Sequence, residues 1–345
     1  MSPASTEQFL LEQYIGHPAS QLQDLRKALY QSVFGCGHLI TDTSAAAEGI
    51  RRETAEAGPC SREIEALDGP WSRVQLGVLA DGLTPETLSR MFARSAAMSH
   101  GDADALQEKL TVLRRLIRSG ALPYSPAEAD AELDDWRKNG FPVCRHSEEY
   151  RAAYRPAYRV LHRTYVRLLP LLAAIDQALA ENPRVLLAIE GGAASGKSTL
   201  ADLLTAIYPD TALFHADDFF LRPEQRTAAR YAQPGGNLDR ERLESEILIP
   251  ISRNEAAVYR LFDCRTLSLR EPVTVLPGRL NIVEGSYSFH PELARYYDLS
   301  VFLDISPETQ RSRILERNGP EWGQQFFDRW IPLEQTYFHE TDTQG

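Results

Sequence analysis

The stretch VLLAIEGGAASGKSTL, residues 185–200, decides the fold of this chain. Its apolar start, Val185–Ile189, predicts a fully buried strand, and the good helix formers from Lys197 onward predict a helix. The connection between them matches G-x-x-x-x-G-K-[ST] in the strand, loop and helix context that this pattern requires. Glycines allow the tight turn and let successive backbone N–H groups point at phosphate oxygens. The stretch therefore predicts a phosphate-binding loop for a nucleoside triphosphate.

Individual positions of this loop have expected roles. Lys197 supplies a compact positive charge for the β- and γ-phosphates, and the Ser198 hydroxyl is expected to ligate Mg²⁺. ATP and Mg²⁺ are the predicted cofactors. The alternative is a glycine-rich turn that matches by chance, which the flanking strand and helix disfavour. The residues expected to bind the nucleotide are Gly191, Gly192, Ala193, Ala194, Ser195, Gly196, Lys197, Ser198 and Thr199.

Composition narrows the class of protein. A chain of 345 residues is long for one core, so two domains are expected, and 43% hydrophobic with 25% charged residues is typical of soluble globular proteins. The net charge of −11 disfavours a general nucleic-acid or anionic-membrane binder. No apolar run could span a bilayer, no secretory leader is evident, and the four cysteines are far apart. These features favour a cytoplasmic protein with a small-molecule partner and leave its oligomeric state open.

The two halves of the chain have different patterns. Residues 1–182 are expected to form a mainly helical domain, which ends at Glu181-Asn182-Pro183. Residues 183–345 alternate apolar strands with helices, which predicts an α/β domain: a P-loop-type parallel sheet with helices on both faces. The expected strands are Val185–Ile189, Ala212–His215, Leu280–Val283 and Leu299–Leu303.

Capping and spacing signals predict helices in the first half. Ser125 and Glu128 have the form of a capping box. Trp71–Leu79 fits either a short strand or an irregular segment. The expected helices are Leu22–Phe34, one beginning after Thr84, Asp102–Arg118, Ser125–Lys138 and Thr164–Ala180.

Tyrosines and arginines recur every four residues in the segment Phe141–Val166. On a helix they would form adjacent stripes, interrupted by a kink or break at Pro156. One hypothesis is a pocket for an anionic ligand; the other, which is favoured, is inward-packed tyrosines and arginines paired with carboxylates. A hydrolytic or metal site is a further alternative, without any supporting ligand spacing, and would use His38, His100 and His146.

Acidic residues follow the predicted strands of the second half, where ligands of parallel sheets bind. Asp217 is the candidate general base for an acceptor hydroxyl, with Asp218 as the second choice. Glu284 is the candidate Mg²⁺ ligand beside Ser198. The alternative role for these acids is helix capping; Asp304 is expected to be structural.

Arginines follow the last predicted strand. Ser306-Pro307-Glu308 is expected to open a helix that stops at Asn318-Gly319. Arg313 and Arg317 lie four apart on one face of it, and they are candidate catalytic residues that stabilise charge on the transferred group. Solvated helix arginines are an equally weighted alternative.

The region from Val185 to Phe338 resembles the uridine kinase/phosphoribulokinase family of P-loop small-molecule kinases, and most of all its compact bacterial members. The resemblance implies phosphoryl transfer from ATP to a hydroxyl, with a nucleoside such as uridine or cytidine as the first expectation. It implies a catalytic aspartate at Asp217, a metal-associated glutamate at Glu284, and a lid that contains Arg313 and Arg317. The segments that carry it are GGAASGKST (Gly191–Thr199), HADDFFLRPEQR (His215–Arg226), QPGGNLD (Gln233–Asp239), YRLFDCRTLSL (Tyr259–Leu269), VEGSYSFHP (Val283–Pro291) and RILERNG (Arg313–Gly319).

The chain departs from this family where the acceptor would bind. Glycines, Gly235 and Gly236, stand where the family has an aspartate for the ribose hydroxyls, and Phe262-Asp263 lacks the histidine that follows in the base-reading segment. A non-nucleoside acceptor and an ATP-gated regulatory or interaction protein therefore stay open as alternatives. The expected acceptor contacts are Asp218, Phe220, Asp263, Arg265 and Tyr287.

The first half resembles an uncharacterised bacterial helical domain associated with such kinases. The matching segments are F-G-x-G-H-L near Phe34–Leu39 and H-S-E-x-Y-R-x-x-Y-x-P-x-Y-R-V near His146–Val160. This resemblance implies no activity.

Overall fold

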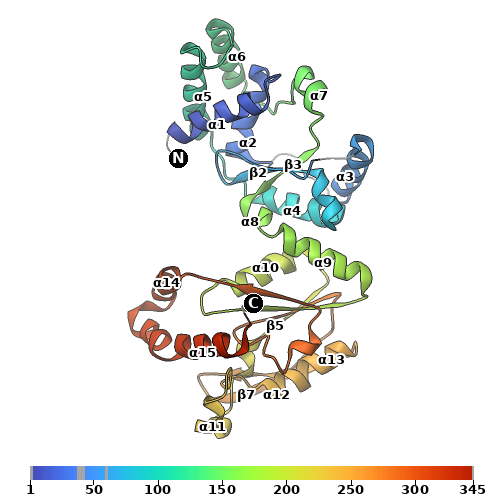
Figure 1. Ribbon diagram of the computed structural model, residues 1–345, viewed down its shortest axis with the longest axis vertical. Helices are drawn as coiled ribbons and strands as arrows, with labels where there is room; N and C mark the ends of the chain where they lie inside the picture. The colour runs from blue at the N-terminus through green and yellow to red at the C-terminus, as the bar shows by residue number, and fades with distance from the viewer. Residues whose placement is uncertain (1–2, 37–42, 59–60, 344–345) are drawn as a thin grey trace. The chain divides into compact units, whose positions relative to one another are not determined.

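The structure is a computed structural model that describes residues 3–36, 43–58 and 61–343. The chain divides into two compact units, Met1–Asp176 and Gln177–Gly345, which Figure 1 colours from blue to green and from green to red. The division falls within helix α9 (Leu169–Glu181), whereas the sequence places the boundary at residue 182. The first part of α9 belongs to the first unit because the Asp176 carboxylate accepts hydrogen bonds from the Thr84 N–H at 2.7 Å and the Thr87 hydroxyl at 2.9 Å.

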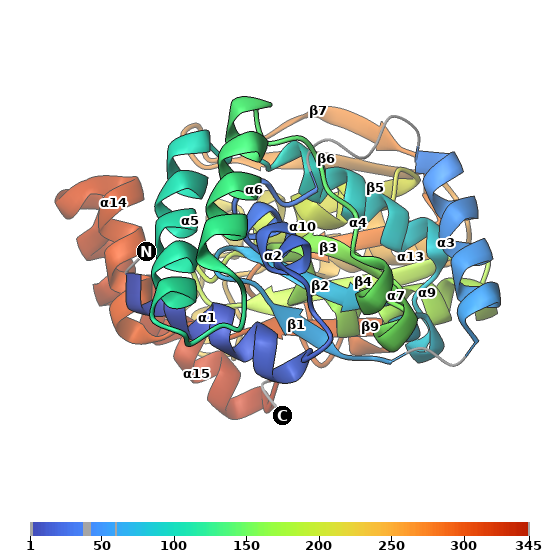
Figure 2. The same cartoon turned by 90° about the horizontal axis from the view of Figure 1, so that it is seen from above.

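The first unit combines helices with a small antiparallel sheet that the sequence analysis does not anticipate. Its strands lie in the order β1-β2-β3, with β1 at Ile64–Ala66, β2 at Trp71–Gln75 and β3 at Tyr158–His162. Figure 2 shows α5 (Ala103–Arg118) and α6 (Pro126–Lys138) side by side. The helices that precede α9 are α1 (Pro3–Gly16), α2 (Leu22–Phe34), α3 (Thr43–Ala57), α4 (Pro85–Ala97), α5 (Ala103–Arg118), α6 (Pro126–Lys138), α7 (Glu148–Tyr154) and α8 (Arg163–Val166), with a 3₁₀ turn at Leu76–Asp81.

Local signals predict most of these helices correctly. Thr84 caps α4 by accepting from the Thr87 N–H at 3.2 Å, and Asp102 caps α5 by accepting from the Ala105 N–H at 2.7 Å. The capping box at Ser125 is wrong, because the Ser125 side chain makes no capping hydrogen bond. Trp71–Leu79 is resolved into strand β2 and the 3₁₀ turn.

The tyrosine and arginine stripes do not continue along one helix. Helix α7 ends before Arg155, which adopts a left-handed φ of 45°, and Tyr158 lies on strand β3. The proline at 156 ends the helix rather than kinking it, since it can neither donate a backbone hydrogen bond nor leave its predecessor helical. Tyr150 is buried and stacks on His146 at 4.1 Å, and Arg159 pairs with Glu53 at 2.8 Å. These contacts support the packing interpretation.

The histidines in the described part of the first unit form no metal site. His146 contacts Asp24 Oδ1 at 2.8 Å and the Tyr158 hydroxyl at 2.6 Å, so its ring is held inside a buried polar network. Within the described ranges, no group of three or more His, Cys, Asp or Glu side chains is placed to hold a metal ion. His38, residues 37–39 of the F-G-x-G-H-L segment, and Cys60 lie outside the described residues. Cys36, Cys144 and Cys264 are free thiols.

The second unit is an α/β domain built on a four-stranded parallel sheet flanked by helices. All four predicted strands are confirmed, in the spatial order β5-β8-β4-β9. Every residue of the two central strands is buried, as expected for strands covered on both faces. The strands are β4 (Val185–Gly191), β5 (Thr211–His215), β8 (Leu280–Glu284) and β9 (Leu299–Leu303), and the helices are α10 (Lys197–Ile207), α11 (Ala228–Tyr231), α12 (Arg240–Leu243), α13 (Ile249–Ser252), α14 (Pro307–Gln325) and α15 (Ile331–Thr341).

An antiparallel hairpin in the second unit escapes the sequence analysis. It consists of β6 (Ala257–Asp263) and β7 (Ser268–Val275), with a register shift between Arg260 and Phe262. Strand β6 alternates buried and exposed residues at its start, a usable signal, but β7 is exposed along nearly its whole length. A strand without a buried face carries no hydrophobic periodicity to detect.

Parallel pairing gathers the strand ends at one edge of the sheet. Strand β4 lies between β8 and β9, and Glu284 is level with Ile189 on β4 and with His215 on β5. The segments that follow these strands therefore emerge at the same edge of the sheet. None of the helices in the described part of the chain combines the length and the apolar character needed to cross a membrane.

We expect the buried strands to carry most of the stability of this sheet. Val283 on β8 is 0% exposed, whereas Val258 on β6 is 54% exposed. Val283→Ala should lower the free energy of unfolding by about 2 kcal/mol, because it removes two buried methyl groups and leaves a cavity. The matched control Val258→Ala should lower it by less than about 0.5 kcal/mol. Denaturant unfolding of the full chain measures both values, and equal effects would contradict the arrangement of the sheet.

Candidate active site

The loop between β4 and α10 turns sharply at two glycines. Gly191 has φ 146° and Gly196 has φ 107°, and a Cβ on Gly191 would lie 2.6 Å from the Leu303 carbonyl oxygen. Ala194 is also in the left-handed region, at φ 60°. This backbone brings the loop close to β9 and starts α10 directly at Lys197.

The Lys197 side chain lies back across the loop. Its Nζ donates to the carbonyl oxygens of Gly191 at 2.8 Å and Gly192 at 3.0 Å, and to the Ser286 hydroxyl at 3.5 Å. An ammonium group has three donors, so all three are used within the protein.

Ser198, Glu284 and His215 form a chain of contacts at the carboxyl edge of the sheet. The Ser198 hydroxyl donates to Glu284 Oε1 at 3.2 Å, and His215 Nδ1 lies 2.6 Å from the same oxygen. Glu284 is 6% exposed. The hydrogen bond to Glu284 raises the pKa of His215, although burial opposes the shift. His215 begins the segment HADDFFLRPEQR, and its position in the sequence predicts no role for it.

Asp217 lies in the turn that follows β5. Although the residue presents surface to solvent, the surrounding protein desolvates its carboxyl group enough to raise the pKa, and the charge of Glu284 raises it further. The charges of Lys197, His215 and Arg317 act in the opposite direction. Lys197, Asp217 and Glu284 therefore lie within electrostatic reach of one another, and Ser198 joins them through its hydrogen bond to Glu284.

The next two candidates lie beside Asp217 in the chain. Desolvation raises the pKa of Asp218, and the charge of Asp217 adds to this shift. Phe220 forms an isolated antiparallel bridge with Leu238, which ties the turn after β5 to the loop before α12.

Helix α14 contacts the outside of the phosphate loop. It begins at the N-cap Ser306 and is interrupted at Gly319, where φ is 73° and ψ is 171°, as the sequence predicts. Arg313 Nη1 donates to the Ala194 carbonyl at 3.0 Å, and Gln310 Nε2 donates to the Ala193 carbonyl at 2.9 Å. Arg313 thus stabilises the backbone conformation of the loop through its hydrogen bond to Ala194.

The second lid candidate, Arg317, makes different contacts. It donates to Asn318 Oδ1 at 2.9 Å, and its guanidinium lies 5.8 Å from the centre of the Phe326 ring. Its charge lowers the pKa of Asp217.

Two of the other acceptor candidates, Asp263 and Tyr287, have their side chains engaged within the fold. Asp263 accepts from the Arg265 N–H at 2.8 Å and from Arg270 Nη2 at 2.9 Å, which shapes the tip of the β6–β7 hairpin. Arg265 is exposed at this tip. Tyr287 is buried against Tyr337, with ring centres 4.9 Å apart. Partial desolvation raises the pKa of the exposed Cys264 thiol, and the charge of Asp217 raises it further, which indicates that the hairpin tip approaches the site.

Backbone packing explains the glycines that replace the family's aspartate. A Cβ on Gly236 would lie 1.9 Å from the Arg230 carbonyl oxygen, and one on Gly235 would lie 3.1 Å from His290 Cδ2 and 3.2 Å from Tyr337 Cδ2. An aspartate at Gly236 would therefore require a change in the backbone, and one at Gly235 would have to adopt a left-handed φ of 64° and displace the neighbouring rings.

Two buried glutamates are functional candidates that the sequence analysis misses. Glu190 accepts from the N–H groups of Gly191 at 2.8 Å, Tyr287 at 3.0 Å and Phe289 at 3.0 Å, and from the Tyr337 hydroxyl at 3.2 Å. An acidic residue inside an apolar strand is a signal that could have been noticed.

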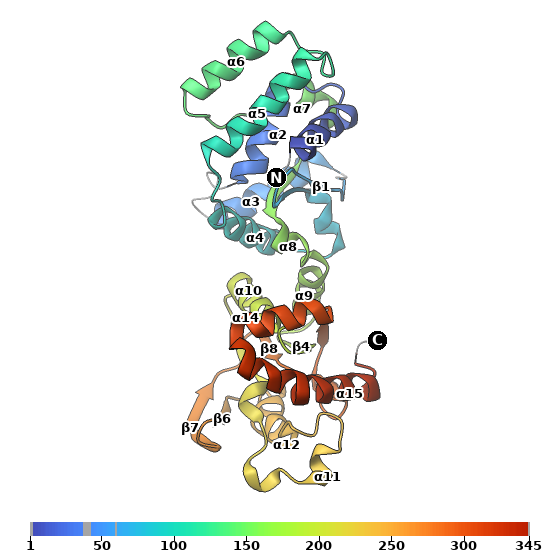
Figure 3. The ribbon, with the colours of Figure 1, turned by 90° about the vertical axis from the view of Figure 1, so that its left-hand side faces the viewer.

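The other is Glu334 on α15. Its Oε2 accepts from the Ala193 N–H at 2.9 Å, and its Oε1 accepts from the Ser286 hydroxyl at 2.6 Å. Figure 3 shows α14 and α15, in red, next to β4 and β8. No local motif marks Glu334.

This chain is similar to known proteins over only about half of its length. No family model matches the chain, and no curated protein matches it. A solved structure described as a possible uridine kinase from Bacillus stearothermophilus is similar over 50% of this chain and 94% of its own, with 20% identity and a TM-score of 0.37. A putative fructose transport system kinase from Silicibacter sp. TM1040 is similar over 45% of this chain and 86% of its own, with 22% identity and a TM-score of 0.37.

The free energy of unfolding of the chain should depend on the protonation of Glu190. Burial raises the pKa of Glu190 to about 7. Between pH 4.5 and 7 the folded chain keeps a proton that the unfolded chain releases, so the free energy of unfolding should fall as the pH rises, by up to about 3 kcal/mol.

Glu190→Gln removes this titration, so its free energy of unfolding should depend less steeply on pH, even though the variant is less stable throughout. Denaturant unfolding at pH 5, 6, 7 and 8 measures both slopes. Parallel curves for the wild-type chain and Glu190→Gln would show that Glu190 does not titrate in this range.

Proposed function

We propose that this protein is an ATP- and Mg²⁺-dependent phosphotransferase that moves the γ-phosphoryl group to a hydroxyl of a small molecule, with a nucleoside as the first acceptor class. The observation that carries this proposal is the convergence of Lys197, Ser198, Glu284 and Asp217 at the carboxyl edge of the sheet. Phosphoryl transfer needs positioning and neutralisation of charge more than covalent participation by the protein.

The phosphate loop holds the triphosphate. Backbone N–H groups at the start of α10 bind phosphate oxygens, and Lys197 Nζ leaves the loop carbonyls to neutralise the β- and γ-phosphates. Arg313 and Gln310, which donate to loop carbonyls from α14, keep the loop backbone in place.

The oxygens of Ser198 and Glu284 fit Mg²⁺. They lie 3.2 Å apart, and Mg²⁺ at such sites takes few protein oxygens, with phosphate and water supplying the rest. The bound ion neutralises charge on the phosphates. His215 positions the Glu284 carboxylate through its 2.6 Å contact.

Asp217 acts as the general base. Its raised pKa brings it closer to neutral pH, where a base that takes up a proton is most effective. As the acceptor oxygen forms its bond to the γ-phosphorus, its proton passes to Asp217 and the bond to the β-phosphate oxygen breaks, which releases ADP. Arg317 offsets the negative charge near this carboxylate.

The acceptor would lie between the turn after β5 and the tip of the β6–β7 hairpin. Asp218 is the carboxylate available there for sugar hydroxyls, since Asp263 already binds Arg270 and a side chain at Gly236 would clash with the Arg230 carbonyl. The hairpin does not supply the histidine of a base-reading segment. A small polyol or sugar is therefore the competing acceptor class.

The test is ADP release by the full chain with a panel of nucleosides, sugars and vitamins. Asp217→Asn should lower kcat at least about 100-fold and leave ATP affinity within a few-fold, because it removes the base without removing a phosphate contact. Lys197→Ala should weaken ATP binding as well as turnover.

Asp304→Asn is the matched control, because Asp304 is exposed at the end of the neighbouring strand β9 and accepts from the Ile305 N–H. It should keep wild-type turnover. Near wild-type kcat in Asp217→Asn would overturn the role of Asp217. Tight ATP binding without turnover for any acceptor would replace the proposal by an ATP-gated regulator.

A further inference from the structure

In this structure a carboxylate of the chain itself is hydrogen-bonded to the phosphate loop. The Glu334 carboxylate is 6% exposed, and it accepts the Ala193 N–H at 2.9 Å and the Ser286 hydroxyl at 2.6 Å. Ala193 lies in the middle of the loop whose N–H groups are suited to phosphate oxygens. A carboxylate oxygen and a phosphate oxygen are acceptors of the same kind, so both cannot use this N–H group at once.

The Lys197 ammonium group is likewise hydrogen-bonded within the protein. Its three donors go to the carbonyls of Gly191 and Gly192 and to Ser286, the residue that also donates to Glu334. The Ala193 N–H and the Lys197 ammonium, with which the loop would bind a triphosphate, are therefore already hydrogen-bonded to other groups of the protein.

We propose that Glu334 and the first turn of α15 form a gate on the phosphate loop, in which the Glu334 carboxylate takes the place of a phosphate oxygen until a nucleotide displaces it. This inference rests on the proposed function, since it assigns regulation to the same site. It makes α15 an autoinhibitory element built into the chain.

Electrostatics favours displacement when a triphosphate arrives. The Glu334 carboxylate lies close enough to Lys197 and Asp217 for both charges to act on it. A triphosphate brings several negative charges to the same N–H groups and the same ammonium, and at such short range repulsion between like charges in a partly desolvated site is strong. Glu334 must withdraw for the phosphates to bind.

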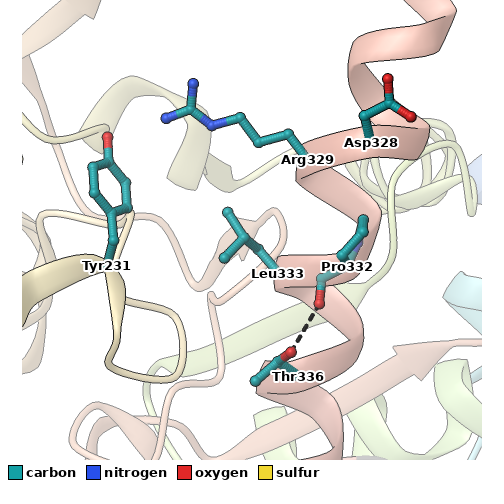
Figure 4. A pocket seen from close by; sticks show the side chains of 6 residues that line it. All are labelled: Tyr231, Asp328, Arg329, Pro332, Leu333 and Thr336. Carbon is teal, nitrogen blue, oxygen red and sulfur yellow. Dashed lines mark hydrogen bonds between the residues drawn. The ribbon is translucent and has the colours of Figure 1, made fainter. Parts of the chain in front are cut away.

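The helix has space on its other side. A pocket of about 420 Å³ lies between Tyr231 on α11 and the face of α15 that carries Pro332, Leu333 and Thr336 (Figure 4). At about 100° per residue, Glu334 points roughly opposite to this face. A shift of the first turn of α15 away from the loop would therefore move into open space.

The backbone before α15 supplies points of bending. Gly319 breaks the helix at φ 73° and ψ 171°, and residues Phe326–Trp330 form a wider π-helical turn before Pro332. Proline has no N–H to donate, and its ring crowds the preceding turn, so this turn is irregular and easier to deform.

The far end of α15 is fixed, which limits the motion to the gate. Tyr337 is 0% exposed and stacks near His290 at 6.0 Å, and Phe338 packs on Phe302 at 5.0 Å. The Tyr337 hydroxyl also donates to Glu190. The helix is therefore held at Tyr337 and Phe338, which confines the proposed motion to its first turn and the Glu334 side chain.

The experiment is calorimetric titration of the full chain with ATP and with inorganic pyrophosphate. Glu334→Ala should bind both ligands about tenfold more tightly than the wild-type chain, because no internal anion has to be displaced. Glu334→Gln, which keeps the size of the side chain but removes its charge, should show a smaller gain in the same direction. Glu340→Gln is the matched control on the exposed face of α15 and should bind like the wild-type chain.

Hydrogen exchange on the wild-type chain gives a second readout that requires no variant. Nucleotide should accelerate backbone exchange in residues 326–334 and leave residues 337–341 protected. Absence of nucleotide binding by the wild-type chain would overturn the proposed function itself. Normal wild-type binding with equal or weaker binding by both Glu334 variants, or with unchanged exchange in residues 326–334, would overturn the gate alone and leave the phosphotransferase proposal standing.

Discussion

A buried carboxylate ties the parts of the second unit together. Glu190 ends the apolar run of β4 and receives hydrogen bonds from the loop that follows it, from the segment after β8 and from α15. A charge in the interior is costly unless it is fully hydrogen-bonded, so these three segments are constrained to meet at one point. The phosphate loop, Ser286 and Glu334 take their relative positions from this constraint.

The site combines parallel-sheet geometry with an excess of negative charge. Register pairing brings His215 and Glu284 level at the sheet edge, and Asp217 follows immediately. Lys197 and Arg317 only partly offset the carboxylates Asp217, Glu284 and Glu334, and burial raises the pKa of Asp217 and Glu334. A site of this kind is suited to a cation and a polyphosphate bound together, since the metal balances the carboxylates and the ammonium balances the phosphates.

Much of the candidate site could be predicted from the sequence because its residues follow strands directly. The phosphate-loop pattern marks Lys197 and Ser198, and the ends of apolar runs mark Asp217 and Glu284. Gln310 and Glu334 could not be predicted, because they reach the loop across the fold from helices that begin more than a hundred residues later. Tyr287 and Asp263 lie in segments that resemble the kinase family, but neither has a side chain free for an acceptor. Tyr287 packs against Tyr337, and Asp263 binds Arg270 at the tip of the hairpin.

The sequence by itself determined the elements whose signals are local: the buried strands, the capped helices and the break at Gly319, because hydrophobic runs, N-caps and left-handed glycines act within a few residues. It also predicted the phosphate-binding role that we propose for residues 191–199. Only the tertiary structure decided the antiparallel sheet of the first unit, the β6–β7 hairpin, the strand position of Tyr158 and the seating of Glu334 on the loop. These features depend on pairing and packing between distant segments, for which no short stretch of sequence carries a signal.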